Sequence, residues 1–146
     1  VNMQTVLNKS KAGSGAQEKL KKNFESQNKK FKDESNSLKK QETELISQKK
    51  SLSPEEYKKK VSELRKKNID FQQRRRNASN DFVKKKNNAR NQLLKALNPI
   101  LQKYMSDNNV MMIINEKNVI LANSKKDLTK TIIGLLDKEL KSIKLN

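Results

Sequence analysis

The chain has 146 residues and a formal net charge of +18, with 32% hydrophobic and 34% charged residues and neither cysteine nor histidine. This composition excludes disulfides, thiolate metal sites and cysteine catalysis, and it removes histidine, the commonest general base. The longest fully apolar run, 110–114, is too short to span a membrane. So little apolar surface cannot fill a compact globule, and the scarcity of Gly and Pro favours long helices over disorder.

The N-terminal segment is predicted to hold a strand end, a short helix and a break. Residues 1–3 would be the end of a strand, and 4–11 a short helix. Gly13 would end that helix, because glycine readily adopts the left-handed conformation of a helix C-cap. Ser14 followed by Gln17 matches a capping box, so the next helix is expected to begin there.

A seven-residue apolar repeat runs through the next predicted helix. One line holds most of its apolar side chains, namely Phe24, Phe31, Leu38, Leu45 and Leu52. A strict heptad repeat keeps one seam facing a neighbouring helix and favours left-handed supercoiling. With one apolar residue per heptad, the predicted seam is thin.

The stretch 49–57 predicts a sharp reversal between two long helices. Ser53 can accept from backbone N–H groups, and Pro54 suits the first helical position, where no N–H is needed. Glu56 completes a capping box with Ser53 and suits the positive end of the helix dipole. The chain is therefore expected to fold back here into a hairpin of helices.

After the reversal, apolar positions alternate in steps of four and three, the a/d pattern of a coiled coil. These positions are Tyr57, Val61, Leu64, Asn68, Phe71, Arg75, Ala78 and Phe82. The apolar face widens over 93–101, as in a helix that enters a core. Pro99 removes one backbone hydrogen bond and should bend the helix near 95–99, either as a hinge or as a static kink.

Two short apolar runs predict a β-hairpin near the C-terminal end. Residues 110–114 and 119–121 flank a four-residue loop, and both runs resemble buried strands. Because an isolated two-stranded hairpin is marginal in water, the strands are expected to join those of other copies. The predicted oligomerisation residues are Val110, Met111, Met112, Ile113, Ile114, Val119, Ile120 and Leu121. A last helix follows, with Asp127 as its predicted cap.

Positive charge is concentrated between residues 16 and 106, where 25 Lys or Arg face 11 Asp or Glu, a net of +14. Such runs either form a solvated helix face or attract an acidic partner. Carboxylates are scattered along solvated faces, and the few glycines form no phosphate-binding loop. We therefore expect neither an enzyme nor a bound metal or cofactor.

Together these elements predict an α+β fold that is predominantly helical. Residues 1–15 and 106–146 would form a body with a small β-strand oligomerisation core. Residues 16–105 would form a long protruding antiparallel coiled-coil hairpin, with its tip at 49–57.

The order and spacing of several short motifs resemble the Skp/OmpH family of periplasmic chaperones for outer-membrane proteins. The motifs are Val1-Asn2-Met3, Lys11-Ala12-Gly13, the reversal at 53–57, the runs 110–115 and 119–123, and Asp127-Leu128-Thr129 with Ile132-Ile133 and Leu136-Asp137. The resemblance implies a homotrimer with a central strand barrel and three tentacle-like hairpins around a cavity. An unfolded outer-membrane β-barrel protein (a client) would be held there without ATP, in the periplasm, with any signal peptide removed or absent from this chain.

The resemblance also implies roles for particular residues. Electrostatic capture of the client is assigned to Lys39, Lys40, Lys49, Lys50, Lys58, Lys59, Arg65, Lys66, Arg74 and Arg76. Apolar client contacts are assigned to the four phenylalanines, although the more usual role of such residues is only to join the two helices: Phe24, Phe31, Phe71 and Phe82. Candidate anionic-lipid contacts, which do not match the family's lipopolysaccharide-binding residues one for one, are Lys84, Lys85, Lys86 and Arg90.

Two other functions fit parts of the sequence. Charge alone is consistent with a basic coiled-coil protein that binds nucleic acid, with steeply salt-dependent affinity. A purely structural spacer would bind neither a client nor nucleic acid.

Overall fold

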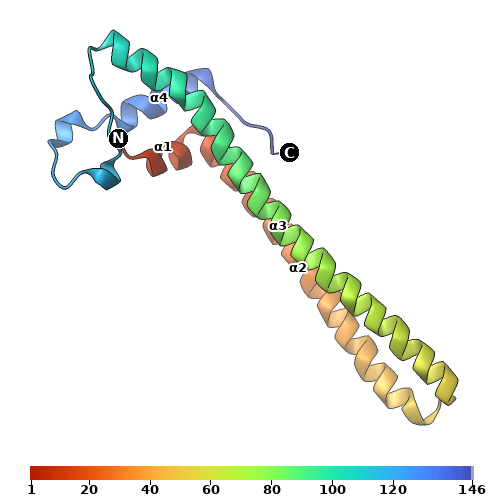
Figure 1. The fold of residues 1–146 in the computed structure, drawn as a ribbon. Helices are drawn as coiled ribbons and strands as arrows, with labels where there is room; N and C mark the ends of the chain where they lie inside the picture. Colours follow the sequence, from red (N-terminus) through yellow and green to blue (C-terminus); the bar gives the residue numbers. More distant parts are fainter. Residues whose placement is uncertain (146) are drawn as a thin grey trace. The chain divides into compact units, whose positions relative to one another are not determined.

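The structure is a computed structural model that describes residues 1–145 (Figure 1). Its elements in chain order are α1 (Met3–Lys9), α2 (Lys11–Ser47), η1 (Gln48–Lys50), α3 (Pro54–Asp107), η2 (Glu116–Asn118), η3 (Ser124–Lys126) and α4 (Thr129–Glu139), where η denotes a 3-10 helix. The described residues form two compact units, which we call the hairpin unit, 22–83, and the terminal unit, 1–21 with 84–145. The prediction of a predominantly helical chain with two long helices is confirmed.

The hairpin unit consists of the antiparallel parts of α2 and α3, which lie side by side (Figure 1). Its seam follows the predicted heptad repeat, since Leu38, Leu45 and Phe71 are at most 9% exposed. Two aromatic pairs join the helices: Phe24 with Phe82, whose ring centroids are 4.9 Å apart, and Phe31 with Phe71, at 6.0 Å.

The reversal has the predicted capping box. The Glu56 amide donates to Ser53 Oγ at 3.3 Å, and the Ser53 amide donates to Glu56 Oε2 at 3.2 Å. The Ser53 hydroxyl also donates to Glu56 Oε2, at 2.8 Å. These bonds lower the pKa of Glu56 below its ordinary value. Pro54 is the first residue of α3, where its missing N–H leaves no bond unmade.

The break between the first two helices lies at Ser10, and the predicted break at Gly13 is wrong. Gly13 lies within α2 and has no positive φ. Ser10 is fully buried, and its Oγ accepts from the Gly13 amide at 3.2 Å, so a serine cap starts α2. Glycine is needed at position 13 for space, because a Cβ there would lie 1.8 Å from the Leu7 carbonyl oxygen.

The terminal unit has a helical core. Val6 of α1, Leu97 of α3 and two residues of α4, Ile132 and Leu136, are at most 1% exposed and pack together. α3 continues to Asp107 with Pro99 inside it. The hinge at Pro99 stays a prediction.

A chain of hydrogen bonds links the N-terminus to the start of α4. The Asn2 amide donates to Thr129 Oγ1 at 2.7 Å, and the Thr129 hydroxyl and amide both donate to Asp127 Oδ1. These bonds hold the pKa of Asp127 below its ordinary value. The predicted cap at Asp127 is displaced by one residue, since Leu128 occupies the cap position, but Asp127 still binds the first amide of α4.

The predicted strands at 110–114 and 119–121 are not formed within residues 1–145 of this single chain. The segment is irregular and includes η2 in place of the loop. Its largest apolar side chains are exposed: Met111 91%, Met112 65%, Ile114 46%, Ile120 105% and Leu121 91%. A strand needs a neighbour for its backbone groups, and among residues 1–145 only Val1 pairs with this segment from elsewhere in the chain in the manner of a strand. Val1 donates to the Ile114 carbonyl and accepts from the Glu116 amide, as in a single rung of a parallel ladder.

Candidate functional site

The cations that sequence analysis assigned to client capture all belong to the hairpin unit and are exposed. Lys39 and Lys40 extend from α2, and Lys49 and Lys50 from η1 at the reversal. The remaining six extend from α3: Lys58, Lys59, Arg65, Lys66, Arg74 and Arg76. Within residues 1–145, nine of these ten form no ion pair, so their charge faces solvent.

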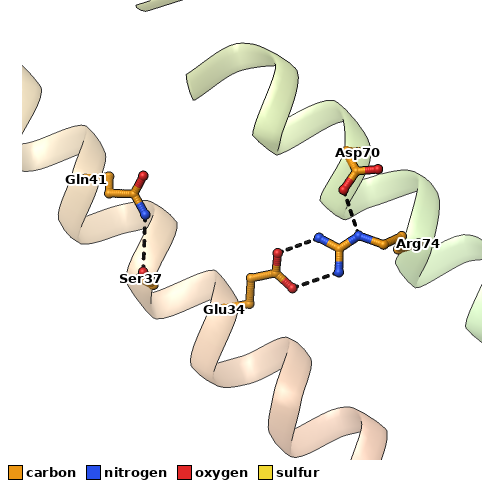
Figure 2. A network of polar contacts seen from close by, with 5 residues as sticks. All are labelled: Glu34, Ser37, Gln41, Asp70 and Arg74. Atoms are coloured by element: carbon orange, nitrogen blue, oxygen red, sulfur yellow. Dashed lines mark hydrogen bonds and ion pairs between the residues drawn. The ribbon is translucent and has the colours of Figure 1, made fainter. Parts of the chain in front are cut away.

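Arg74 is the exception, because two carboxylates hold it (Figure 2). Its Nη1 and Nη2 donate to Glu34 across the hairpin at 3.0 and 2.5 Å, and its Nε donates to Asp70 at 2.7 Å. The hydrogen bonds from Arg74 lower the pKa of Glu34, and those to Glu34 and then Asp70 raise the pKa of Arg74. An arginine used in this way ties the two helices together and offers less free charge than its neighbours.

Two lysines that sequence analysis did not single out also bridge α2 and α3. Lys60 Nζ donates to Gln48 Oε1 at 3.2 Å, and Lys67 Nζ donates to Gln41 Oε1 at 3.0 Å. The a/d pattern could have located them, since both residues flank seam positions. Their stems line a shallow polar hollow of about 250 Å³ beside Leu45 and Leu64. The seam near the reversal is therefore polar at its edges.

The four phenylalanines pair across the hairpin, as the joining role requires. Phe71 is only 3% exposed, whereas Phe24 is 43% exposed. Arg75 lies over the Phe71 ring, with its guanidinium carbon 5.7 Å from the ring centroid. Phe31 and Phe82 are half-buried, so solvent reaches both aromatic pairs, and only the Phe71 ring is enclosed.

The remaining predicted site residues lie in the terminal unit. Lys84, Lys86 and Arg90 are exposed on α3, and Lys85 is half-buried. The predicted oligomerisation residues form the irregular segment 110–121, whose exposed side chains make an apolar stretch. A separate groove of about 680 Å³ lies between α3 and α4, beside Pro99, Tyr104 and Leu135.

Within residues 1–145, no helix is both long enough and apolar enough to cross a membrane.

Comparisons with known proteins identify both a family and a fold. Residues 1–136 match the model of the family described as "Outer membrane protein (OmpH-like)". The structure is similar to the crystal structure of a candidate outer membrane chaperone (OmpH-like) from Caulobacter crescentus CB15, with a TM-score of 0.89 and 17% sequence identity. That match covers 98% of this chain and 85% of the other. No curated protein matches the sequence. At 17% identity, the structural likeness shows a shared fold.

Proposed function

The chain belongs to the OmpH-like family of outer membrane proteins, and we propose on this basis that it is an ATP-independent holdase chaperone. It would capture unfolded outer-membrane β-barrel proteins between basic helical hairpins and prevent their aggregation before membrane insertion. The fold that it shares with a candidate outer membrane chaperone supports this role. The corresponding location is the periplasm.

The observation that carries the proposal is the unpaired positive surface of the hairpin unit. Nine exposed cations that form no ion pair with any described residue produce a field that attracts an acidic polypeptide before contact. The buried seam holds the two helices together, so these side chains are presented along a long ordered surface and need not stabilise the fold.

We propose that the protein is a homotrimer joined through the segment 110–121. Contiguous exposed apolar side chains are typical of interaction sites, and this segment exposes five large ones. Its backbone pairs with Val1 in one rung only, so further strands can add beside it. Three copies would complete the strand core that the single chain lacks.

Aggregation of an unfolded β-barrel protein after dilution from urea tests the chaperone role. We expect suppression at about one trimer per client and low salt, with slower capture as salt rises. No suppression at low salt would refute the proposal.

A matched pair of charge variants locates the capture surface. One variant changes four hairpin lysines to Gln: Lys39, Lys40, Lys58 and Lys59. The control removes four exposed charges from the terminal unit, outside the segment 110–121: Lys125, Lys126, Lys130 and Lys138. Both lose four positive charges, but only the first should slow association, by about tenfold. Equal slowing would mean that net charge alone attracts the client.

The oligomeric state has its own test. Ile120→Glu should convert the trimer to a monomer in analytical ultracentrifugation, because the side chain is fully exposed in one chain and would be buried in the trimer. Lys125→Glu, exposed on η3 and outside the segment 110–121, is the control and should remain trimeric. A wild-type monomer at micromolar concentration would contradict the proposal.

Binding assays with DNA and with lipid vesicles test the remaining binding hypotheses. A nucleic-acid-binding protein would bind DNA with steep salt dependence and fail to protect the client. Binding to vesicles with anionic lipid that is lost when the lysines at 84–86 and Arg90 are changed to Gln would establish the lipid contact.

A further inference from the structure

A hollow of about 220 Å³ interrupts the aromatic seam of the hairpin unit. Phe24 and Phe31 of α2 line it, and each is paired with a ring of α3. Opposite them α3 places Ala78, flanked by Arg75 and Ser79. The hollow therefore lies between two aromatic pairs, where the seam position is occupied by a methyl group.

The hollow is open to solvent on an aromatic side. Phe24 is 43% exposed, and Arg75 and Ser79 are exposed as well. Of the seven described residues that line it, Arg75 is the only charged one, and none carries a carboxylate. The lining thus combines two aromatic rings and a methyl group with the neutral polar side chains Gln27, Asn28 and Ser79 and the single positive charge of Arg75.

We propose that this hollow binds one aromatic side chain from an acidic segment of an unfolded polypeptide. The inference rests on the proposed chaperone function and names the feature of the client that is recognised. The volume is below the roughly 300–1,000 Å³ of small-molecule pockets, so one side chain is a suitable occupant. Phe24 and Phe31 can contact an inserted ring edge-to-face or offset, the favoured aromatic geometries.

Arg75 supplies the charge selectivity. Its guanidinium already lies over the Phe71 ring, 5.7 Å from the centroid, and so is positioned at an aromatic surface. A carboxylate beside the inserted ring along the client chain would pair with it. A folded protein buries most of its aromatic side chains, so the site selects unfolded chains.

Peptide binding to the full-length protein tests the inference. Two fluorescein-labelled peptides serve as probes, Glu-Glu-Ser-Phe-Ser-Glu-Glu and the same peptide with Ala in place of Phe. Wild-type protein should bind the Phe peptide about tenfold more tightly by fluorescence anisotropy, since one aromatic side chain is buried only in that complex.

Filling the hollow should abolish this preference. Ala78→Leu inserts a side chain into the hollow and removes no recognition group, so the two peptides should bind within about twofold of each other. Asn80→Leu adds the same side chain at an exposed α3 position outside the hollow and should keep the full preference. Circular dichroism melting verifies that the variants are folded. If Ala78→Leu does not fold, Ala78→Met takes its place.

Three outcomes would overturn the inference: equal binding of the two peptides to wild type, an unchanged preference in the filled variants, or loss of the preference in Asn80→Leu. Stacking of a nucleobase at the same site would appear as tighter binding of poly-dT than of an abasic oligonucleotide of equal length to wild type, with the difference lost in Ala78→Leu, and it too would overturn the assignment.

Failure of the inference is distinguishable from failure of the proposed function. If wild type prevents client aggregation but shows no Phe preference, the chaperone role stands and the hollow is a packing gap. If the Phe preference disappears in the filled variants but wild type fails to protect the client, the hollow is a peptide site in a protein that is not a holdase.

Discussion

The terminal unit and the hairpin unit bury their apolar side chains to different degrees. In the terminal unit, residues from α1, α3 and α4 surround one another, and Val6, Leu97 and Ile132 are at most 1% exposed. In the hairpin unit only two helices meet, so Leu45 keeps 9% exposure and Phe24 keeps 43%. Two helices enclose fewer side chains than three do, although Phe71 is only 3% exposed. The hairpin unit therefore has a thinner buried seam, to which its cap and its polar cross-links add.

The largest expected effect comes from truncating one leucine in each unit. Leu97→Ala should lower the free energy of unfolding by about 3 kcal/mol, because it opens a cavity in an enclosed core. Leu45→Ala should cost about 1 kcal/mol, since two helices can close toward the gap. Urea unfolding followed by circular dichroism measures both. Equal losses would show that the hairpin seam is packed as tightly as the core.

Two glycines of α2 should respond with opposite signs. Gly13→Ala should destabilise the terminal unit by about 2 kcal/mol, because its Cβ would overlap the Leu7 carbonyl oxygen. Gly15→Ala meets nothing within 4 Å and should stabilise α2 by about 0.5–1 kcal/mol through helix propensity. Thermal melting of the two variants measures both changes in stability. A stabilising Gly13→Ala would refute the close approach.

Removal of the cap at the reversal should have a smaller effect. Ser53→Ala loses the bond to the Glu56 amide and should destabilise the hairpin unit by about 1 kcal/mol. Ser62→Ala, at an exposed position inside α3, is the control and should change stability by less than about 0.5 kcal/mol. Hydrogen exchange of amides near the reversal would detect the fraying. Similar exchange in both variants would contradict the cap.

The smallest effect is a pH dependence of the hairpin unit. Arg74 holds the pKa of Glu34 below its ordinary value of 4.5, so the folded state favours the carboxylate. This contribution is complete at neutral pH and is lost as the pH falls below 4.5 through the lower folded-state pKa. The protection of amides near residues 34 and 74, measured as the intrinsic exchange rate at each pH divided by the observed rate, should therefore fall between about pH 5 and about pH 3. Glu34→Gln should show a smaller fall in protection over that range, and a fall equal to that of wild type would exclude the Arg74 contact as its cause.

Local chemistry made the hairpin predictable. Ser53, Pro54 and Glu56 determine the reversal through bonds within four residues, and the heptad line from Phe24 to Leu45 marks the buried face of one helix. The sequence was sufficient to predict where the capture cations lie and that they are exposed. It was not sufficient to predict the ion pair of Arg74, because Glu34 is 40 residues away and the distance between the two side chains depends on how α2 and α3 align.

Other features depended on contacts that a local pattern does not contain. The break at Ser10 arises because α1 and α2 meet at a tight corner. The Gly-Ser-Gly sequence that begins three residues later is typical of a helix break, so the sequence pattern placed the break at Gly13. The apolar runs 110–114 and 119–121 have strand composition, but composition does not supply a partner for their backbone groups. The hollow at Ala78 is visible only when the opposing rings are in place.

The contact between Glu34 and Arg74 has a consequence for alignment. A seam with one apolar residue every seven matches itself again when one helix slides past the other by a heptad, about 10 Å. A seam made of leucines alone would pack equally well in the original alignment and in the one shifted by a heptad. After such a slide Arg74 would face Gln27 or Gln41 in place of Glu34, and at most one aromatic pair could form in place of two, so these few contacts select one register out of several that the repeat permits.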